Sequence, residues 1–287
     1  MHTLAAPSRS AGVPGRALAA LVALVAGLVA AFVVVPPRLA AVDSAGDLAD
    51  PGQLNAAFRT AVVDYWRSGK LNYPPALQRV VDYWLRFHLV KGGIAALLLI
   101  VLVALAVLLW RTFLRADGLG MAGRAALVSA GTTVQLLALF ALAAVMANLQ
   151  GAVAPFASLL PLLMDGTPDA GLAGPLSQAR GELAGSHRTG GYTPPALDAM
   201  VSDFARYHVA LAVVAAVVVV ALLGLSVMFW RRFAHTASAD RRARRVLAWF
   251  GVFSALSSLI VAVVLIANAG TAIDPAPGLL ALFDGGF

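Results

Sequence analysis

Residues 74–113 read PPALQRVVDYWLRFHLVKGGIAALLLIVLVALAVLLWRTF, and residues 194–233 read PPALDAMVSDFARYHVALAVVAAVVVVALLGLSVMFWRRF. Each stretch starts with two prolines and passes through mixed residues into a long apolar run. Proline is favoured in the first turn of a helix, so we expect helices to begin at Pro75 and Pro195. About 20 apolar residues suffice to cross a bilayer as a helix. Both stretches therefore predict a membrane-spanning helix with an extension outside the bilayer.

The whole chain has the composition of a membrane protein. Of its 287 residues 60% are hydrophobic and 12% are charged, and the mean hydropathy of +0.84 is too high for a soluble domain. With no cysteine there is no disulfide framework, thiolate metal site or cysteine nucleophile. We expect an all-α, polytopic transmembrane helix bundle of about five spans. The expected spans are 17–35, 90–110, 125–147, 208–230 and 246–268.

The two quoted stretches predict an internal repeat. A shift of 120 residues aligns them without a gap and gives 15 identities in 40, among them the prolines, Arg86 with Arg206, His88 with His208, and Trp110 with Trp230. The same shift pairs Asn148 with Asn268 and Pro155 with Pro275. Two copies in one orientation predict parallel repeats about an axis normal to the membrane, so equivalent residues lie at equal depth.

This repeat sets the expected organisation of the chain. Helical spacing in 51–67, and more weakly in 175–184, predicts further helices in a small helical outer cap. The first span and its outer loop could be a degraded extra half-unit. The expected parts are a first transmembrane helix within 1–36, an outer helical loop 37–73, repeat 1 at 74–164, an outer loop 165–193 and repeat 2 at 194–287.

The placement of charge predicts the orientation. Eleven of the 19 arginines and two of the 14 acids, a net charge of +9, lie before the first span or in the two short turns, and the remaining segments sum to −2. Because arginine and lysine are enriched in cytoplasmic loops, we expect a cytoplasmic N-terminus and a C-terminus outside. Membrane topology explains the excess of basic residues, so we do not expect a nucleic-acid partner. Contact of the inner arginines with anionic lipid headgroups stays an alternative.

The first apolar run, 17–35, has a second interpretation. Arg9 and Arg16 before it, and Arg38-Leu39-Ala40-Ala41 after it, partly fit a cleavable signal peptide. The run is long for a signal peptide, so we favour a retained helix. Frequent alanine and the excess of arginine over lysine, 19 against 2, are typical of a GC-rich bacterial genome. We therefore expect a protein of a bacterial plasma membrane.

The candidate ligand-binding residues lie near the outer membrane interface. Leu77, Val81, Trp84 and His88 form one helical stripe, as do Leu197, Val201, Phe204 and His208. The two imidazoles are thus expected on packing faces at equal depth, with three alternatives: hydrogen bonds to neighbouring helices, contacts to a quinone or lipid headgroup, or paired ligation of haem or a metal. The set of candidates is His88, His208, Arg86, Arg206, Asn148 and Asn268.

Four further predictions concern these residues and their neighbours. Asp82 and Asp203 should pair with Arg86 and Arg206 along one helix face. Asn148 and Asn268 should end their helices, since asparagine tolerates the left-handed cap. The short apolar segments 159–164 and 279–283 should lie on the outer leaflet or dip into the bundle. Anchoring at the inner interface is expected from the tryptophan-arginine pairs Trp110-Arg111 and Trp230-Arg231.

No nucleotide loop, dinucleotide fingerprint, serine-hydrolase motif or acidic residue within a span accompanies these features. The leading hypothesis is a non-enzymatic membrane interaction or accessory protein that contacts lipids and another membrane protein or a second copy of itself, without a cofactor. One alternative is an outer-leaflet lipid or amphiphile binder or carrier. Another is a haem-containing redox protein with His88 and His208 as axial ligands.

Overall fold

The computed structural model describes residues 15–42, 46–115, 118–166, 170–185 and 194–286. Five residues of the charge count lie outside these ranges: Arg9, Asp43, Asp117, Asp169 and Arg188. Within these ranges the chain is helical and has no β-strand, which confirms the all-α class. Five helices are long and apolar enough to cross a membrane: α1 (Gly15–Ala40), α3 (Pro75–Arg115), α4 (Met121–Val153), α7 (Pro195–His235) and α8 (Arg241–Ile273). The shorter elements are η1 (Gly46–Ala49), α2 (Pro51–Ser68), α5 (Pro155–Leu159), η2 (Leu160–Met164), α6 (Ala170–Gly185) and α9 (Pro275–Phe283).

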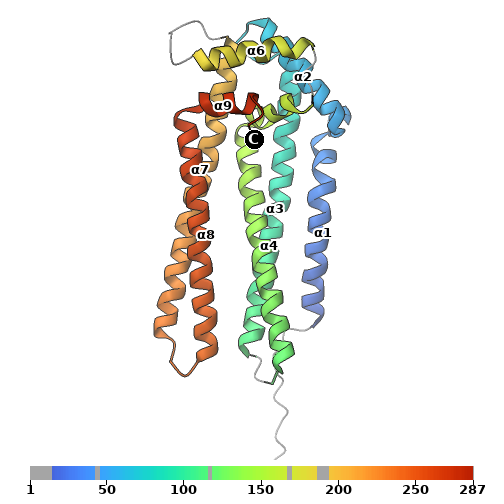
Figure 1. Ribbon diagram of the computed structural model, residues 1–287. Helices are drawn as coiled ribbons and strands as arrows, with labels where there is room; N and C mark the ends of the chain where they lie inside the picture. The colour runs from blue at the N-terminus through green and yellow to red at the C-terminus, as the bar shows by residue number, and fades with distance from the viewer. Residues whose placement is uncertain (1–14, 43–45, 116–117, 167–169, 186–193, 287) are drawn as a thin grey trace, which may run out of the picture.

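The long helices run side by side, and the short helices gather at one end of them (Figure 1). α3 packs along α4 and α7 along α8, which gives two antiparallel hairpins; α1 packs on α3, and α4 contacts α7 between the hairpins. The arginine-rich turns after α3 and α7 lie at the opposite end. Below, the cap means η1, α2, α5, η2, α6, α9 and the first turns of α3 and α7. The two ends of the bundle are the cap end and the turn end.

The prolines begin the long helices, as predicted. α3 and α7 start at Pro75 and Pro195, and each has 41 residues. At 1.5 Å per residue such a helix is roughly 62 Å long, about twice the hydrocarbon thickness, so it reaches from the turn end into the cap. The bounds of α4 and α8, 33 residues each, also differ by 120. These bounds agree with the predicted shift; the repeat itself stays a prediction.

The outer surface of the hairpins suits lipid. Large apolar side chains point away from the protein on α3, α7 and α8, among them Ile100, Val220 and Ile266, the last 71% exposed. A soluble protein rarely exposes a continuous apolar surface of this size, because water solvates it poorly. Together with the length of the five helices, this surface identifies the chain as a membrane protein.

The cap has its own hydrophobic core. Phe58 and Tyr65 of α2, Leu77 of α3, Phe156 of α5 and Leu197 of α7 are almost fully buried in it. The ring of Phe156 packs against Phe58 with centroids 6.2 Å apart, and Tyr73 lies 5.1 Å from the same ring. One continuous core therefore joins residues from both hairpins.

The short apolar segments are buried in the cap rather than spread on the membrane. Leu159, Leu160 and Leu163 are fully buried, as are Leu279 and Phe283 of α9. Since they pack with α2, α6 and α7 in the same core, the alternative of a segment lying on the leaflet does not describe them.

An arginine from a cap helix holds the end of each short segment. Arg59 of α2 donates to the carbonyl oxygens of Leu162 (3.3 Å) and Leu163 (3.2 Å). Arg180 of α6 donates to the carbonyl oxygen of Phe283 and lies 3.1 Å from the Asp284 carboxylate. Leu163 and Phe283 are 120 residues apart, so α2 and α6 serve the two hairpins in the same way.

Candidate functional site

Each candidate histidine pairs with an asparagine of its own hairpin. His88 Nδ1 lies 3.1 Å from Asn148 Oδ1, and His208 Nδ1 lies 2.7 Å from Asn268 Oδ1. The amide nitrogen of each asparagine donates to a carbonyl one turn earlier, Asn148 to Ala144 at 2.7 Å and Asn268 to Val264 at 2.8 Å. Within the described chain, no hydrogen bond or ring contact joins one pair to the other. The structure thus brings the four residues together as two pairs.

This geometry fixes the tautomer of both imidazoles. Because each amide nitrogen already donates to a carbonyl, Oδ1 faces the ring and can only accept. Nδ1 of His88 and of His208 must therefore carry the proton. In the neutral ring Nε2 is then the acceptor, and it is the atom left for any further partner.

The two Nε2 atoms have different surroundings. Ser158 Oγ lies 3.4 Å from Nε2 of His88, accepts a 2.8 Å hydrogen bond from the Trp84 indole and donates to the Pro155 carbonyl oxygen at 3.0 Å. Nε2 of His208 is buried without a partner among the described residues, and Gly278 takes the position equivalent to Ser158. Sequence reasoning missed Ser158, since a serine in an apolar segment carries no distinguishing pattern.

Gly151 is the second residue near His88 that the sequence did not indicate. A Cβ on Gly151 would lie 2.5 Å from atoms of the His88 ring, so the imidazole packs flat against backbone. At the equivalent position the second hairpin has Thr271. The close fit between ring and helix is therefore a property of the first hairpin.

The arginines do not join the histidines. Arg206 pairs with Asp203 at 3.0 Å, which confirms that prediction. The predicted pair of Arg86 with Asp82 is wrong: Arg86 donates to the carbonyl oxygen of Val42 at 3.1 Å, and Asp82 accepts from Gln78 at 2.7 Å. The segment after α1 passes close to Arg86 and offers it a backbone acceptor, which helix spacing does not reveal.

The asparagines lie inside their helices, so the prediction that they end them is wrong. α4 continues past Asn148 to Val153, and α8 continues past Asn268 to Ile273. Their side chains bond along the helix and to histidine, which suits an interior position. The helices end instead where Pro155 and Pro275 start the next segment.

At the turn end, the two predicted anchors differ. Trp110 is buried and packs against Gly131, with its ring 3.0 Å from the Cβ position of that glycine; Trp230 packs in the same way on Gly251 but is 42% exposed. Arg111 and Arg231 are exposed. The buried Trp110 thus serves helix packing, and the exposed Trp230 keeps contact with the surroundings.

An apolar groove of about 300 Å³ separates the hairpins in the cap-side half of the bundle. Its walls come from one face of α4 and one face of α8, closed by Leu211 of α7. Two lining side chains are polar and almost fully buried, Gln150 (4% exposed) and Ser257 (6% exposed). Neither side chain has a hydrogen bond to another described residue. The remaining lining residues are Leu139, Leu142, Ala143, Met146, Ala147, Ile260, Val261 and Val264.

The described residues place no three His, Cys, Asp or Glu side chains close enough together to hold a metal ion. The fold and this groove define the chain as an all-α, multi-helix membrane protein. Comparison with protein-family models, with curated proteins and with solved structures found no match in any of the three.

Proposed function

We propose that this chain is a non-enzymatic membrane protein that binds one amphiphile in the cap-side leaflet, with the apolar tail in the groove between the hairpins. The observation that carries the proposal is the groove itself. From Leu139 to Gln150 it follows α4 for roughly 17 Å at 1.5 Å per residue, close to the thickness of one leaflet, which is about half of 30 Å. A single acyl or isoprenoid chain matches this length.

The polar groups in the groove support an occupant with polar atoms. The side chains of Gln150 and Ser257 line the groove and have no hydrogen-bond partner on the described chain, so both can bond to polar atoms of an occupant. Gln150 lies at the cap end of the groove, where a lipid ester or headgroup would be. His88, His208, Arg86 and Arg206 are not assigned to the headgroup, because their hydrogen bonds are made within the protein, apart from Nε2 of His208.

Filling the groove tests this proposal. Ala147 lines the groove and is exposed, so Ala147→Phe should place a ring in it without disturbing the core. We expect mass spectrometry of extracts from delipidated protein to show one tightly retained amphiphile per chain. In Ala147→Phe the retained amount should fall about tenfold, since an occluded apolar contact of this size contributes about 1.5–3 kcal/mol.

Ala267→Phe is the matched control. Ala267 is the residue 120 positions further on, is also exposed, and does not line this groove. It adds the same ring to the lipid-facing surface and should leave the retained amphiphile unchanged. Equal retention in wild type and Ala147→Phe, or equal loss in both variants, contradicts the proposal.

A membrane interaction or accessory protein is the second candidate, favoured by the cap. Its continuous core fixes several short helices at the end of two helices roughly 62 Å long, which gives a rigid platform for a partner. This candidate predicts that neither phenylalanine substitution changes the amphiphile content, so the same experiment separates the two.

We also propose the orientation that the charges indicate: turn end in the cytoplasm of a bacterial cell, cap end outside the plasma membrane. Because the chain has no cysteine, single-cysteine variants report topology without background. In intact cells a membrane-impermeant maleimide should label Leu71→Cys at the cap end and leave Ser238→Cys at the turn end unlabelled until lysis. The reverse pattern would overturn the orientation.

A further inference from the structure

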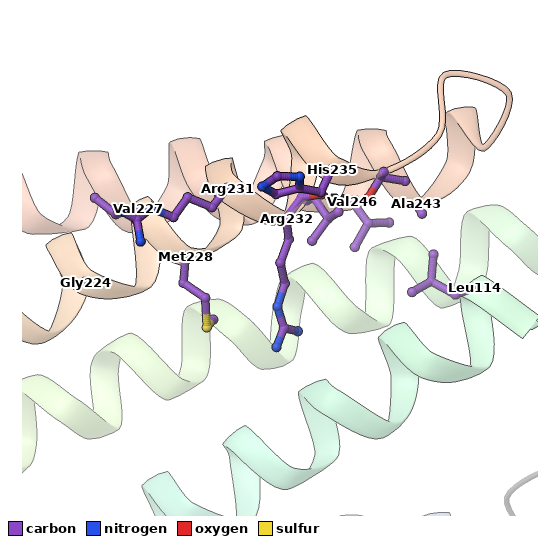
Figure 2. A pocket seen from close by; sticks show the side chains of 11 residues that line it. Leu114, Gly224, Val227, Met228, Arg231, Arg232, His235, Ala243 and Val246 are labelled. Carbon is purple, nitrogen blue, oxygen red and sulfur yellow. Dashed lines mark hydrogen bonds between the residues drawn. The ribbon is translucent and has the colours of Figure 1, made fainter.

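Another pocket of the bundle lies at the turn end and combines a cationic rim with an apolar floor. It has a volume of about 680 Å³ between the α7–α8 hairpin and Leu114 of α3. Figure 2 shows Met228 and Arg232 on α7 directed to the side on which Leu114 lies. The pocket lining includes Gly224, Met228, Arg231, Arg232, His235 and Val246.

The lining changes character along α7. Gly224, Val227 and Met228 belong to the apolar stretch that predicts a membrane span, and Arg231 and Arg232 follow directly after it. The pocket thus straddles the level at which the apolar helix surface ends and the polar turn begins. A molecule that fills it must be apolar on the membrane side and anionic on the turn side.

No described residue forms an ion pair with the arginines of the rim. Arg231 and Arg232 are exposed, and on the described chain neither side chain makes an ion pair or hydrogen bond. No acid lines the pocket, and the nearby Asp240 accepts from the backbone nitrogen of Ala243 at the start of α8.

Another residue already satisfies the last carbonyl groups of α7. Arg244 donates to the carbonyl oxygens of Phe233 (3.1 Å) and Thr236 (3.0 Å), and its guanidinium stacks on the Phe233 ring at 3.9 Å. Capping of the helix end therefore does not account for Arg231 and Arg232. Guanidinium groups that are free, paired in sequence and set beside an apolar hollow match a phosphate carried on an acyl chain.

We infer that this pocket binds one anionic phospholipid of the turn-side leaflet, with its phosphate at the rim that Arg231, Arg232 and His235 form and one acyl chain over Met228 and Val246. This site is separate from the cap-side groove and does not depend on the proposed function. Charge complementarity selects the occupant: a zwitterionic lipid carries a cation that the arginine rim repels, and a free phosphate leaves the apolar floor uncovered.

Native mass spectrometry of the full chain released from nanodiscs tests the inference. In nanodiscs of equal parts phosphatidylglycerol and phosphatidylcholine, the wild type should retain one phosphatidylglycerol. Arg231→Gln with Arg232→Gln should reduce this adduct about tenfold or more, since each basic residue near an anionic surface contributes about 1 kcal/mol. Inorganic phosphate should not displace the lipid.

The matched control removes two charges from the other turn. Arg111 and Arg115 are exposed at the same end of the bundle and do not line the pocket, so Arg111→Gln with Arg115→Gln should keep the adduct. Gly224→Leu provides a second test with every charge intact. The Cβ position of Gly224 has open space around it, so the leucine should fit the fold, fill the apolar floor and lower retention.

Any of four results would overturn the inference. Equal loss in both double variants would mean attraction by net charge alone. Equal retention of phosphatidylcholine and phosphatidylglycerol would show that the arginines do not select an anionic lipid. Displacement of the adduct by inorganic phosphate, or full retention in Gly224→Leu, would show that no acyl chain occupies the floor.

Discussion

Gly151→Ala is expected to destabilise the first hairpin by about 3 kcal/mol, which is a drop in the melting temperature of roughly 5–10 °C. The added Cβ would lie 2.5 Å from Cε1 and Nε2 of His88, closer than real Cβ contacts. The ring is hydrogen-bonded to Asn148 on the same helix as Gly151 and contacts the Trp84 ring, with centroids 5.1 Å apart, so it cannot turn away without losing its hydrogen bond. Thermal unfolding in detergent, followed by intrinsic fluorescence, measures the effect.

Gly270→Ala is the control for this substitution. Gly270 lies in α8 near the second His–Asn pair, and its Cβ position has open space around it. Alanine there should be neutral or stabilise the helix by up to about 1 kcal/mol.

A double-mutant cycle identifies the ring as the cause. His88→Ala removes the obstacle, so adding Gly151→Ala to it should cost less than about 0.5 kcal/mol. If Gly151→Ala costs as much in the His88→Ala background as in the wild type, the predicted clash is not the source of the loss.

This substitution also marks the limit of what the sequence could predict. The shift of 120 residues predicts both histidines at equal depth, and in the structure each is hydrogen-bonded to an asparagine 60 residues later. That symmetry follows from helix spacing and from short turns that make antiparallel hairpins. Which glycine touches a ring depends on how closely two helices approach, and the equivalent of Gly151 is Thr271. An internal repeat predicts which residues lie at the same depth in the membrane, but it does not predict which side chains touch.

The long helices were predictable for a simple physical reason. Apolar runs of this length are solvated only by lipid or a large core, and proline fixes where a helix can start, so Pro75 and Pro195 were predictable starts. The cap follows different rules. Its short helices are held by bonds from side chain to backbone, such as Arg59 to the Leu163 carbonyl, and a carbonyl acceptor has no signature in the sequence.

The same limit explains the wrong prediction for Arg86. Helix spacing places an aspartate within reach of both Arg86 and Arg206, but contacts with other segments determine which ion pair forms. The Val42 carbonyl oxygen accepts from Arg86, whereas Asp203 is buried in the cap. Asp203 also lacks an acidic counterpart in the first half, where Tyr83 stands 120 residues earlier. A feature present in only one half could not be found by aligning the chain with itself.

Asp203 joins the two hairpins in the cap. Its side chain is only 7% exposed. Oδ2 accepts a 2.9 Å hydrogen bond from the backbone nitrogen of Ala157, and Oδ1 lies 3.0 Å from Arg206. The residue lies on α7, in the cap and before the apolar stretch, while Ala157 is in the first turn of α5. A carboxylate there also suits the positive end of the α5 backbone dipoles.

We therefore expect Asp203→Ala to destabilise the cap by about 2–3 kcal/mol, because it leaves a buried N–H of Ala157 without an acceptor. Asp203→Asn keeps one amide oxygen for that N–H and should cost less than about 1.5 kcal/mol. Arg206→Gln removes only a surface ion pair, from an arginine that is 59% exposed, and should cost less than about 1 kcal/mol. Equal effects of Asp203→Ala and Arg206→Gln would contradict this role.

The pH dependence of unfolding separates the charge of Asp203 from its hydrogen bond. Burial raises the pKa of Asp203 above its ordinary value of 3.8, and the backbone hydrogen bonds and Arg206 only partly oppose this. Between the two pKa values the folded state binds more protons than the unfolded state, so the stability contributed by Asp203 falls as the pH rises through that window. Asp203→Asn cannot titrate. The melting temperature of the wild type minus that of Asp203→Asn should therefore be largest at acid pH and should decrease as the pH rises from about 4. A difference that increases with pH would contradict this prediction. It would mean that the partners of the carboxylate stabilise its charged form more than burial destabilises it.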